Sequence, residues 1–208
     1  MRHKFLVAAL LAASIGQAAY ADTARERLDS FFTNVKSLKG SFTQQVFDKK
    51  GAVTQNSSGD LYLSRPGRFR WVYKTPEPQE MIGDGKNVWI YDKDLEQVTV
   101  KPVNQAVSNT PIAILTRLDP PGSQFNVQEI QGGSGLDWHQ LVPKQASRDF
   151  KYIQLGLDTA GNLKRMVLFD QLGQRTEISL NAQNNVPISG STFYFSPPRG
   201  VDVIGKPQ

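Results

Sequence analysis

The chain of 208 residues contains no cysteine and only two histidines. A disulfide framework is therefore impossible, and structural zinc sites built on cysteine ligands are excluded. The missing cysteine also rules out anchoring through a lipid-modified cysteine. Because His3 belongs to the N-terminal segment described next, His139 alone remains for any histidine-based catalytic site in the rest of the chain.

No apolar run is long enough to cross a bilayer as a helix. The longest, Phe5 to Ile15, has 11 residues, whereas a spanning helix needs about 20. Basic residues precede this run, and Ala19-Tyr20-Ala21 follows it as a small-x-small cleavage site. We therefore predict that residues 1–21 are a cleaved secretory signal peptide of the Sec type and that the mature, soluble chain begins at Asp22.

Strong charge of either sign is also absent. Lys and Arg number 24 against 19 Asp and Glu, a net charge of +5 that falls to +3 once Arg2 and Lys4 leave with residues 1–21. This excess is too small to indicate nucleic-acid binding. We see no linker, repeat or low-complexity tract, so residues 22–208 are predicted to form a single domain.

The mature chain begins with one amphipathic helical pattern and continues with strands. Apolar residues recur at helical spacing from Leu28 to Leu38 after a cap at Asp22 or Thr23, and Thr110-Pro111 marks the start of a second, short helix. Elsewhere the pattern predicts strands near Ser41–Asp48, Ser58–Arg65, Phe69–Lys74, Glu80–Ile82, Val88–Asp92, Gln97–Lys101, Phe125–Ile130, Leu136–Val142, Tyr152–Asp158, Leu163–Asp170, Thr176–Asn181 and Thr192–Ser196.

About eleven strands cannot form one flat open sheet, because twist accumulates and exposed edges invite aggregation. A barrel, a half-barrel or a β-sandwich would solve this. The apolar helices need a surface to cover, which favours a curved antiparallel sheet over a sandwich.

The most informative segment is Gly59 to Trp71, which reads as two strands joined by a turn at Pro66-Gly67. Side chains alternate along a strand, so Arg65 shares one face with Leu61 and Leu63. An arginine that faces an apolar interior must find acceptors, because an unpaired buried charge costs several kcal/mol. A buried ion pair in an ordinary sheet would also satisfy this pattern.

Gly-Asp-Leu-Tyr-Leu-Ser-Arg-Pro-x-x-Phe-x-Trp resembles the signature of the periplasmic outer-membrane lipoprotein carrier family, LolA. Further blocks resemble that family in the same order: Gly40–Gln45, Asp84–Tyr91, Glu96-Gln97, Asn109–Pro111 and Phe195–Val201. The resemblance implies an unclosed barrel with a helical lid, which encloses an apolar cavity suited to acyl chains.

The resemblance also implies roles for individual residues. Arg65 would act as a latch that donates hydrogen bonds to main-chain carbonyls of the lid near Pro111–Leu118. Either Trp89 and Tyr91 or Val88 and Ile90 can face inward, and the aromatic positions of the family favour the first pair. The predicted lining of the acyl cavity is Phe47, Leu61, Leu63, Phe69, Trp71, Met81, Trp89, Tyr91, Ile112, Ile114 and Leu115.

The function implied is that of a periplasmic carrier without catalytic activity, cofactor or metal. It would accept lipoproteins from an inner-membrane ABC-type release complex and pass them, as a monomer, to an outer-membrane acceptor lipoprotein. An alternative is a periplasmic sensor that binds lipid or misfolded chains and regulates a membrane protease, although such proteins add a second domain. Two segments that could suggest an enzyme do not fit one. Gly132–Leu136 lacks the second glycine of a nucleophile elbow, and Gly83–Val88, which is similar to a dinucleotide-binding turn, is predicted to be a hairpin.

Overall fold

The computed structural model describes residues 22–103, 111–147 and 150–208. The predicted signal peptide, the predicted cap at Thr110 and Asn109 lie outside these ranges. Within them no helix is long and apolar enough to span a bilayer.

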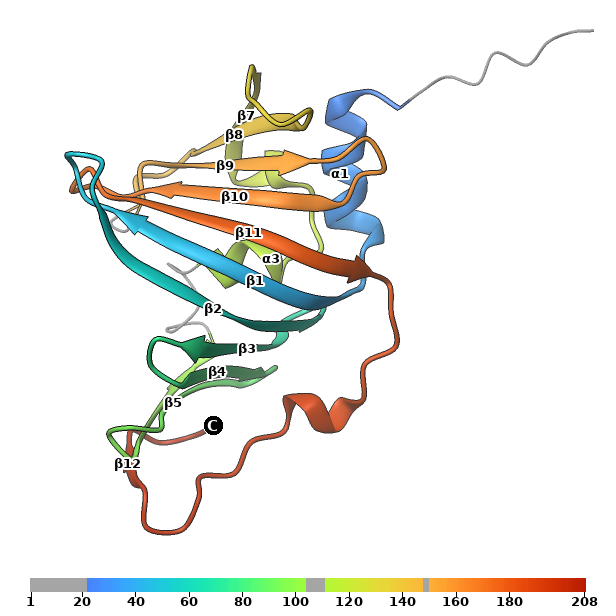
Figure 1. Cartoon of the computed structure of the whole chain (residues 1–208). Helices are drawn as coiled ribbons and strands as arrows, with labels where there is room; N and C mark the ends of the chain where they lie inside the picture. Colours follow the sequence, from blue (N-terminus) through green and yellow to red (C-terminus); the bar gives the residue numbers. More distant parts are fainter. Residues whose placement is uncertain (1–21, 104–110, 148–149) are drawn as a thin grey trace, which may run out of the picture.

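Twelve strands of the described residues form one sheet, which curves without closing into a barrel (Figure 1). The strand order is β12-β6-β5-β4-β3-β2-β1-β11-β10-β9-β8-β7, and neighbours are antiparallel except for the parallel pair β12 and β6. The strands are β1 (Ser37–Phe47), β2 (Val53–Ser64), β3 (Arg68–Thr75), β4 (Gln79–Asp84), β5 (Asn87–Asp92), β6 (Gln97–Pro102), β7 (Phe125–Ile130), β8 (Asp137–Pro143), β9 (Tyr152–Leu157), β10 (Leu163–Phe169), β11 (Arg175–Asn184) and β12 (Asp202–Ile204).

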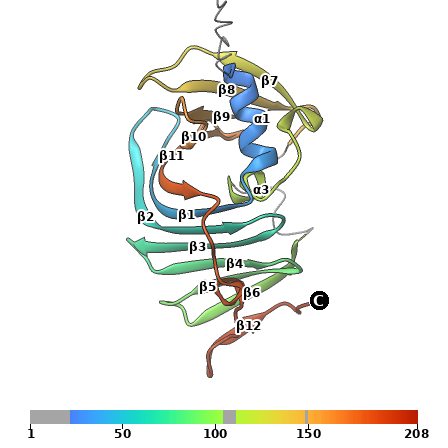
Figure 2. The same ribbon diagram turned by 90° about the vertical axis from the view of Figure 1, so that its right-hand side faces the viewer.

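Two α-helices lie on the concave side of this sheet, as the turned view shows (Figure 2). Helix α1 (Ala24–Asn34) begins at the predicted cap Thr23, whose hydroxyl accepts a hydrogen bond from the Glu26 main chain while the Glu26 carboxylate accepts one in return. Helix α3 begins at Pro111, as predicted, and ends at Leu115. The predicted curved, mainly antiparallel half-barrel covered by helices is confirmed.

Three hairpins use the same five-residue loop, Asp-x-x-Gly-x. In each, one carboxylate oxygen of the aspartate accepts the main-chain N–H groups two and four residues later, and the glycine has a positive φ that other residues rarely adopt. The loops begin at Asp48, Asp158 and Asp170. This local chemistry explains why the strands turn where they do.

Two sequence predictions about elements are wrong. Thr192–Ser196 is not a strand: Gly190–Phe193 form a 3-10 helix, η2, whose cap Ser189 accepts a hydrogen bond from the Ser191 main chain, a local bond that competes with strand pairing. Leu38 does not continue the first helix, which ends at Asn34, and lies instead in β1. Strand β12 was not predicted, since its three exposed residues carry no apolar alternation.

Candidate functional site

The concave face of the sheet and the two helices pack into one apolar cluster. Helix α1 contributes Leu28, Phe31 and Phe32, whose side chains are buried. Strands from both halves of the sheet contribute the rest, from Val88 on β5 to Leu141 on β8. The interior is therefore shared between the sheet and a helical cover, and lifting the helices would expose it.

Seven of the predicted lining residues belong to this cluster and are buried, and an eighth, Met81, packs against it. The seven are Leu61, Leu63, Phe69, Trp71, Ile112, Ile114 and Leu115. Strand pairing explains the grouping, because Leu63 lies opposite Phe69, Leu61 opposite Trp71, and Trp71 opposite Met81.

The predicted orientation of Trp89 and Tyr91 is wrong. Trp89 is paired with Ile82 and Val100 in a second cluster on the outer face, and both aromatic rings contact Phe195 from the C-terminal segment. Val88 and Ile90, the alternative pair, pack on the inner side. The physical reason is that the C-terminal segment supplies an apolar cover for this part of the outer face, so aromatic residues are buried there too.

Phe47 does not belong to the inner cluster either. Its pairing with β2 is interrupted by a bulge between Val46 and Phe47, and its ring lies 4.3 Å from the guanidinium carbon of Arg175. The alternation of β1 explains this, because Leu38 and Phe42 face the inner cluster and Phe47, an odd number of residues from Phe42, faces the other side.

Arg65 is the polar centre of the interior. Its side chain is buried, with 6% of the residue exposed, and it donates to main-chain carbonyls of both helices. Nε lies 2.5 Å from the Leu115 carbonyl oxygen of α3, and Nη1 lies 2.7, 3.2 and 3.0 Å from the carbonyl oxygens of Phe31, Phe32 and Val35. One guanidinium thus joins the sheet to both helices.

The bonds to α1 come at the end where helix carbonyls lack intrahelical partners and where the helix dipole favours a positive charge. The rings of Phe31 and Phe32 lie 4.8 and 5.4 Å from the guanidinium carbon and contribute cation–π attraction. Burial lowers the pKa of Arg65 to about 10, so the group stays charged at neutral pH. Nη2 has no hydrogen-bond partner within the described ranges.

The N-terminal half of α1 is held to the sheet by a different contact. Arg27 donates from Nε to the Asp137 carboxylate on β8 over 2.7 Å, and its Nη2 lies 2.6 Å from the same oxygen. His139, two residues further along β8, is fully buried. Neither of its ring nitrogens has a hydrogen-bond partner in the part of the chain that the structure describes, so Ser134 is not paired with it.

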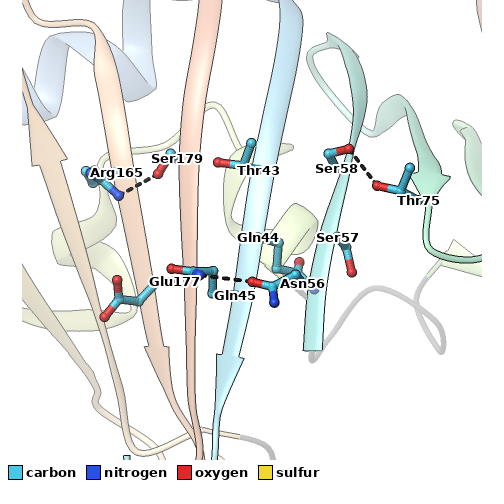
Figure 3. A pocket seen from close by; sticks show the side chains of 10 residues that line it. All are labelled: Thr43, Gln44, Gln45, Asn56, Ser57, Ser58, Thr75, Arg165, Glu177 and Ser179. Atoms are coloured by element: carbon cyan, nitrogen blue, oxygen red, sulfur yellow. Dashed lines mark hydrogen bonds between the residues drawn. The ribbon is translucent and has the colours of Figure 1, made fainter. Parts of the chain in front are cut away.

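Other parts of the outer face carry polar groups. Arg70 contacts the Glu80 carboxylate, which also binds Lys93 Nζ at 2.7 Å, and Nη1 of Arg70 donates to the Thr192 carbonyl at 3.3 Å. A separate groove of about 350 Å³ is lined by hydroxyl and amide side chains together with Arg165 and Glu177 (Figure 3). Hydrogen bonds between Gln45 and Asn56 and between Arg165 and Ser179 cross it. A lining of this kind does not suit an acyl chain.

Sequence reasoning missed the contribution of α1 to the site. The pattern from Leu28 to Leu38 gave a helix with an apolar face, but the acceptors of Arg65 are main-chain carbonyls, which no side-chain pattern encodes. His139 was noticed only as a candidate catalytic base. Its burial follows from facing the same side as Leu141, two residues further along the strand.

Within the described residues, this arrangement brings apolar side chains together around main-chain carbonyls and one guanidinium. Its polar centre is an arginine, which stays protonated and serves as a donor rather than a base. In the described parts of the chain, no three histidine, aspartate or glutamate side chains converge as a metal site would require.

A family model and several related proteins match this chain over most of its length. The family model described as "Outer membrane lipoprotein carrier protein LolA" matches residues 33–196. Proteins named "Outer-membrane lipoprotein carrier protein" are 40% identical over 183 residues in Methylococcus capsulatus, covering 88% of each chain, and 39% identical over 212 residues in Xanthomonas campestris, covering 99% of this chain and 100% of the relative.

A crystal structure of an uncharacterized conserved protein from Thermus thermophilus has a similar fold, with a TM-score of 0.55 at 13% identity, covering 87% of this chain and 96% of that one. At that identity the likeness concerns the fold alone. The family match and the carrier relatives together show that this chain belongs to the outer-membrane lipoprotein carrier family, LolA.

Proposed function

We propose that this chain carries lipoproteins across the periplasm by sheltering their acyl chains in the apolar interior. The observation that supports this most directly is Arg65, which ties α1 and α3 to the sheet through main-chain carbonyls. Such bonds are independent of the side chains in the helices. They hold the cover shut and break when it lifts.

A carrier must bind its cargo without holding it too tightly. Each buried methylene contributes about 0.8 kcal/mol, so full burial of several acyl chains would sum to tens of kcal/mol and prevent release. Hydrogen bonds to a charged donor contribute roughly 1.5–3 kcal/mol each. Opening the Arg65 contacts therefore offsets part of the gain from acyl burial, and the loaded carrier stays poised to unload.

The pathway that we propose has three steps. An inner-membrane ABC-type complex, using ATP, releases a lipoprotein to the carrier; the carrier shields the acyl chains; and an outer-membrane acceptor lipoprotein receives the cargo. In this scheme residues 1–21 direct export and are removed, and residues 22–208 act as one monomeric domain in the periplasm. The names of the relatives support the carrier role, and the chain itself performs no reaction.

The test compares Arg65→Leu with Arg68→Leu in a delivery assay. Both variants remove one guanidinium from the same hairpin, Arg65 from the turn and Arg68 from the start of β3, but Arg68 is exposed and makes none of the contacts to α1 and α3. Each carrier is loaded with a labelled triacylated lipoprotein, and the cargo passed to membranes bearing the acceptor is measured. We expect Arg68→Leu to deliver normally and Arg65→Leu to retain its cargo. Delivery by Arg65→Leu at the normal rate would disprove the proposal.

A further inference from the structure

His139 occupies a position where a titratable group is unusual. It lies on the inner face of β8, opposite Leu155 on β9 and Glu129 on the edge strand β7. None of its surface is exposed, and neither ring nitrogen makes a hydrogen bond of normal length and angle within the described ranges. The main chain of Ala24, at the start of α1, is the polar group that comes near the ring and favours its protonated form. A buried polar group without partners disfavours the conformation that buries it.

The element that covers this strand is α1, which contacts β8 and is fixed at both ends. Arg27 pairs with Asp137 in its N-terminal half, and Arg65 binds the carbonyls at its C-terminal end. Neither contact satisfies the imidazole. Lifting α1 would admit water to His139, whereas closing α1 removes that water.

We propose that His139 is a proton-operated switch: uptake of a proton by its ring favours the conformation in which α1 has lifted from the sheet and the apolar interior is open. This goes beyond the proposed carrier role, which requires that the interior opens but does not specify what biases opening.

The charged groups around the ring decide how large the bias is. Burial lowers the pKa of His139 below its usual value of 6.5, while the carboxylates of Glu129 on β7 and Asp137 on β8 and the main chain of Ala24 offset part of that effect. Arg25 on α1 adds to the lowering. Asp137 is already engaged by Arg27, and Glu129 lies on an exposed edge, so neither carboxylate cancels the cost of burying an imidazolium.

Proton linkage gives the direction in which pH shifts the balance between the closed and the open state. The open state has the higher pKa and binds more protons, so the closed state loses stability as the pH falls below 6.5. One proton changes the ratio of open to closed molecules by at most tenfold per pH unit, and only below the pKa of the open state. With that pKa near its usual value of 6.5, only the unit between pH 6.5 and 5.5 contributes fully. Between pH 7.5 and 5.5 the ratio should therefore rise by up to about tenfold.

The experiment uses the chain purified after expression with its own residues 1–21, and the uncharged probe N-phenyl-1-naphthylamine, whose fluorescence reports apolar binding. We expect probe binding by the parent to rise up to about tenfold from pH 7.5 to 5.5, and binding by His139→Leu and His139→Gln to stay constant. Asp137→Asn, which breaks the contact with Arg27, should raise binding at every pH while keeping the dependence.

A constant signal from the parent would overturn the proposal, as would a pH dependence that persists in His139→Leu. The His139 titration, followed by NMR in the unmodified protein, gives a second measurement that needs no variant. A pKa below 6.5 is expected, and one at or above 6.5 would contradict the proposal. No lipoprotein is used, so these results are independent of whether the chain delivers cargo.

Discussion

Replacing Arg65 by leucine should free both helices from the sheet. The change removes the donor for four main-chain carbonyls, three from Phe31, Phe32 and Val35 at the end of α1 and one from Leu115 in α3. Each buried acceptor left unpaired costs about 1–3 kcal/mol, an upper sum of about 4–12 kcal/mol. The charge leaves with the side chain, so no uncompensated charge stays buried, and we expect a net loss at the low end of that sum, about 3–5 kcal/mol.

Hydrogen–deuterium exchange measures this loss where it occurs. If the Arg65 contacts limit opening of the helices, a loss of about 3–5 kcal/mol accelerates exchange of the α1 amides by roughly 10² to 4 × 10³-fold. Amides in β1 and β11, at the centre of the sheet, should change much less. Arg65→Lys should lie between parent and Arg65→Leu, because an ammonium group has three donors but lacks the planar fork.

Arg68→Leu is the control, since its side chain lies outside the inner cluster. Exchange in α1 that differs less than threefold between Arg65→Leu and Arg68→Leu would show that the Arg65 hydrogen bonds do not limit opening of α1. Apolar packing would then hold the helices against the sheet, and the hydrogen bonds of Arg65 would contribute little to holding them.

Three further predictions concern the frame of the site. Gly59→Ala should prevent stable folding, because the added Cβ would lie 1.7 Å from the Val72 carbonyl oxygen; a parent-like denaturant midpoint would contradict this. Phe195→Ala should lower the free energy of unfolding by about 1–3 kcal/mol by uncovering Trp89, measured from the quenching and red shift of tryptophan emission in denaturant. Burial alone would raise the pKa of Asp84, but hydrogen bonds from Asn87, Trp89 and Lys86 outweigh burial, and the net effect lowers the pKa. Asp84 therefore stabilises the folded state above pH 3.8, and this stabilisation is lost as the pH falls through the lowered pKa. Asp84→Asn should therefore flatten the acid limb of the stability curve, and an unchanged limb would show that other carboxylates dominate.

Local sequence patterns predicted most of the fold. Alternation located the strands, Thr23 and Pro111 marked the helix starts, and Pro66-Gly67 gave the turn that places Arg65 inside. Length and strand count then required curvature. These features are determined by residues close together in the sequence, so local patterns predict them.

What could not be predicted depends on contacts between distant segments. Trp89 was placed on the wrong face because its cover, Phe195, comes from the other end of the chain. The three α1 carbonyls bound by Arg65 carry no side-chain signal, and the burial of His139 depends on how α1 crosses β8. The positions of these side chains depend on strand register and on where the helices lie against the sheet, which local patterns do not determine.

The proposed carrier role requires that this chain take up lipoproteins released from the inner membrane. Inner-membrane vesicles that contain a labelled triacylated lipoprotein and the ABC-type release complex are incubated with the purified chain, with and without ATP. We expect ATP-dependent appearance of lipoprotein in a soluble, stoichiometric complex with the chain. No complex, despite a folded chain and a competent transporter, would contradict the carrier role and favour a sensor of lipid or misfolded chains.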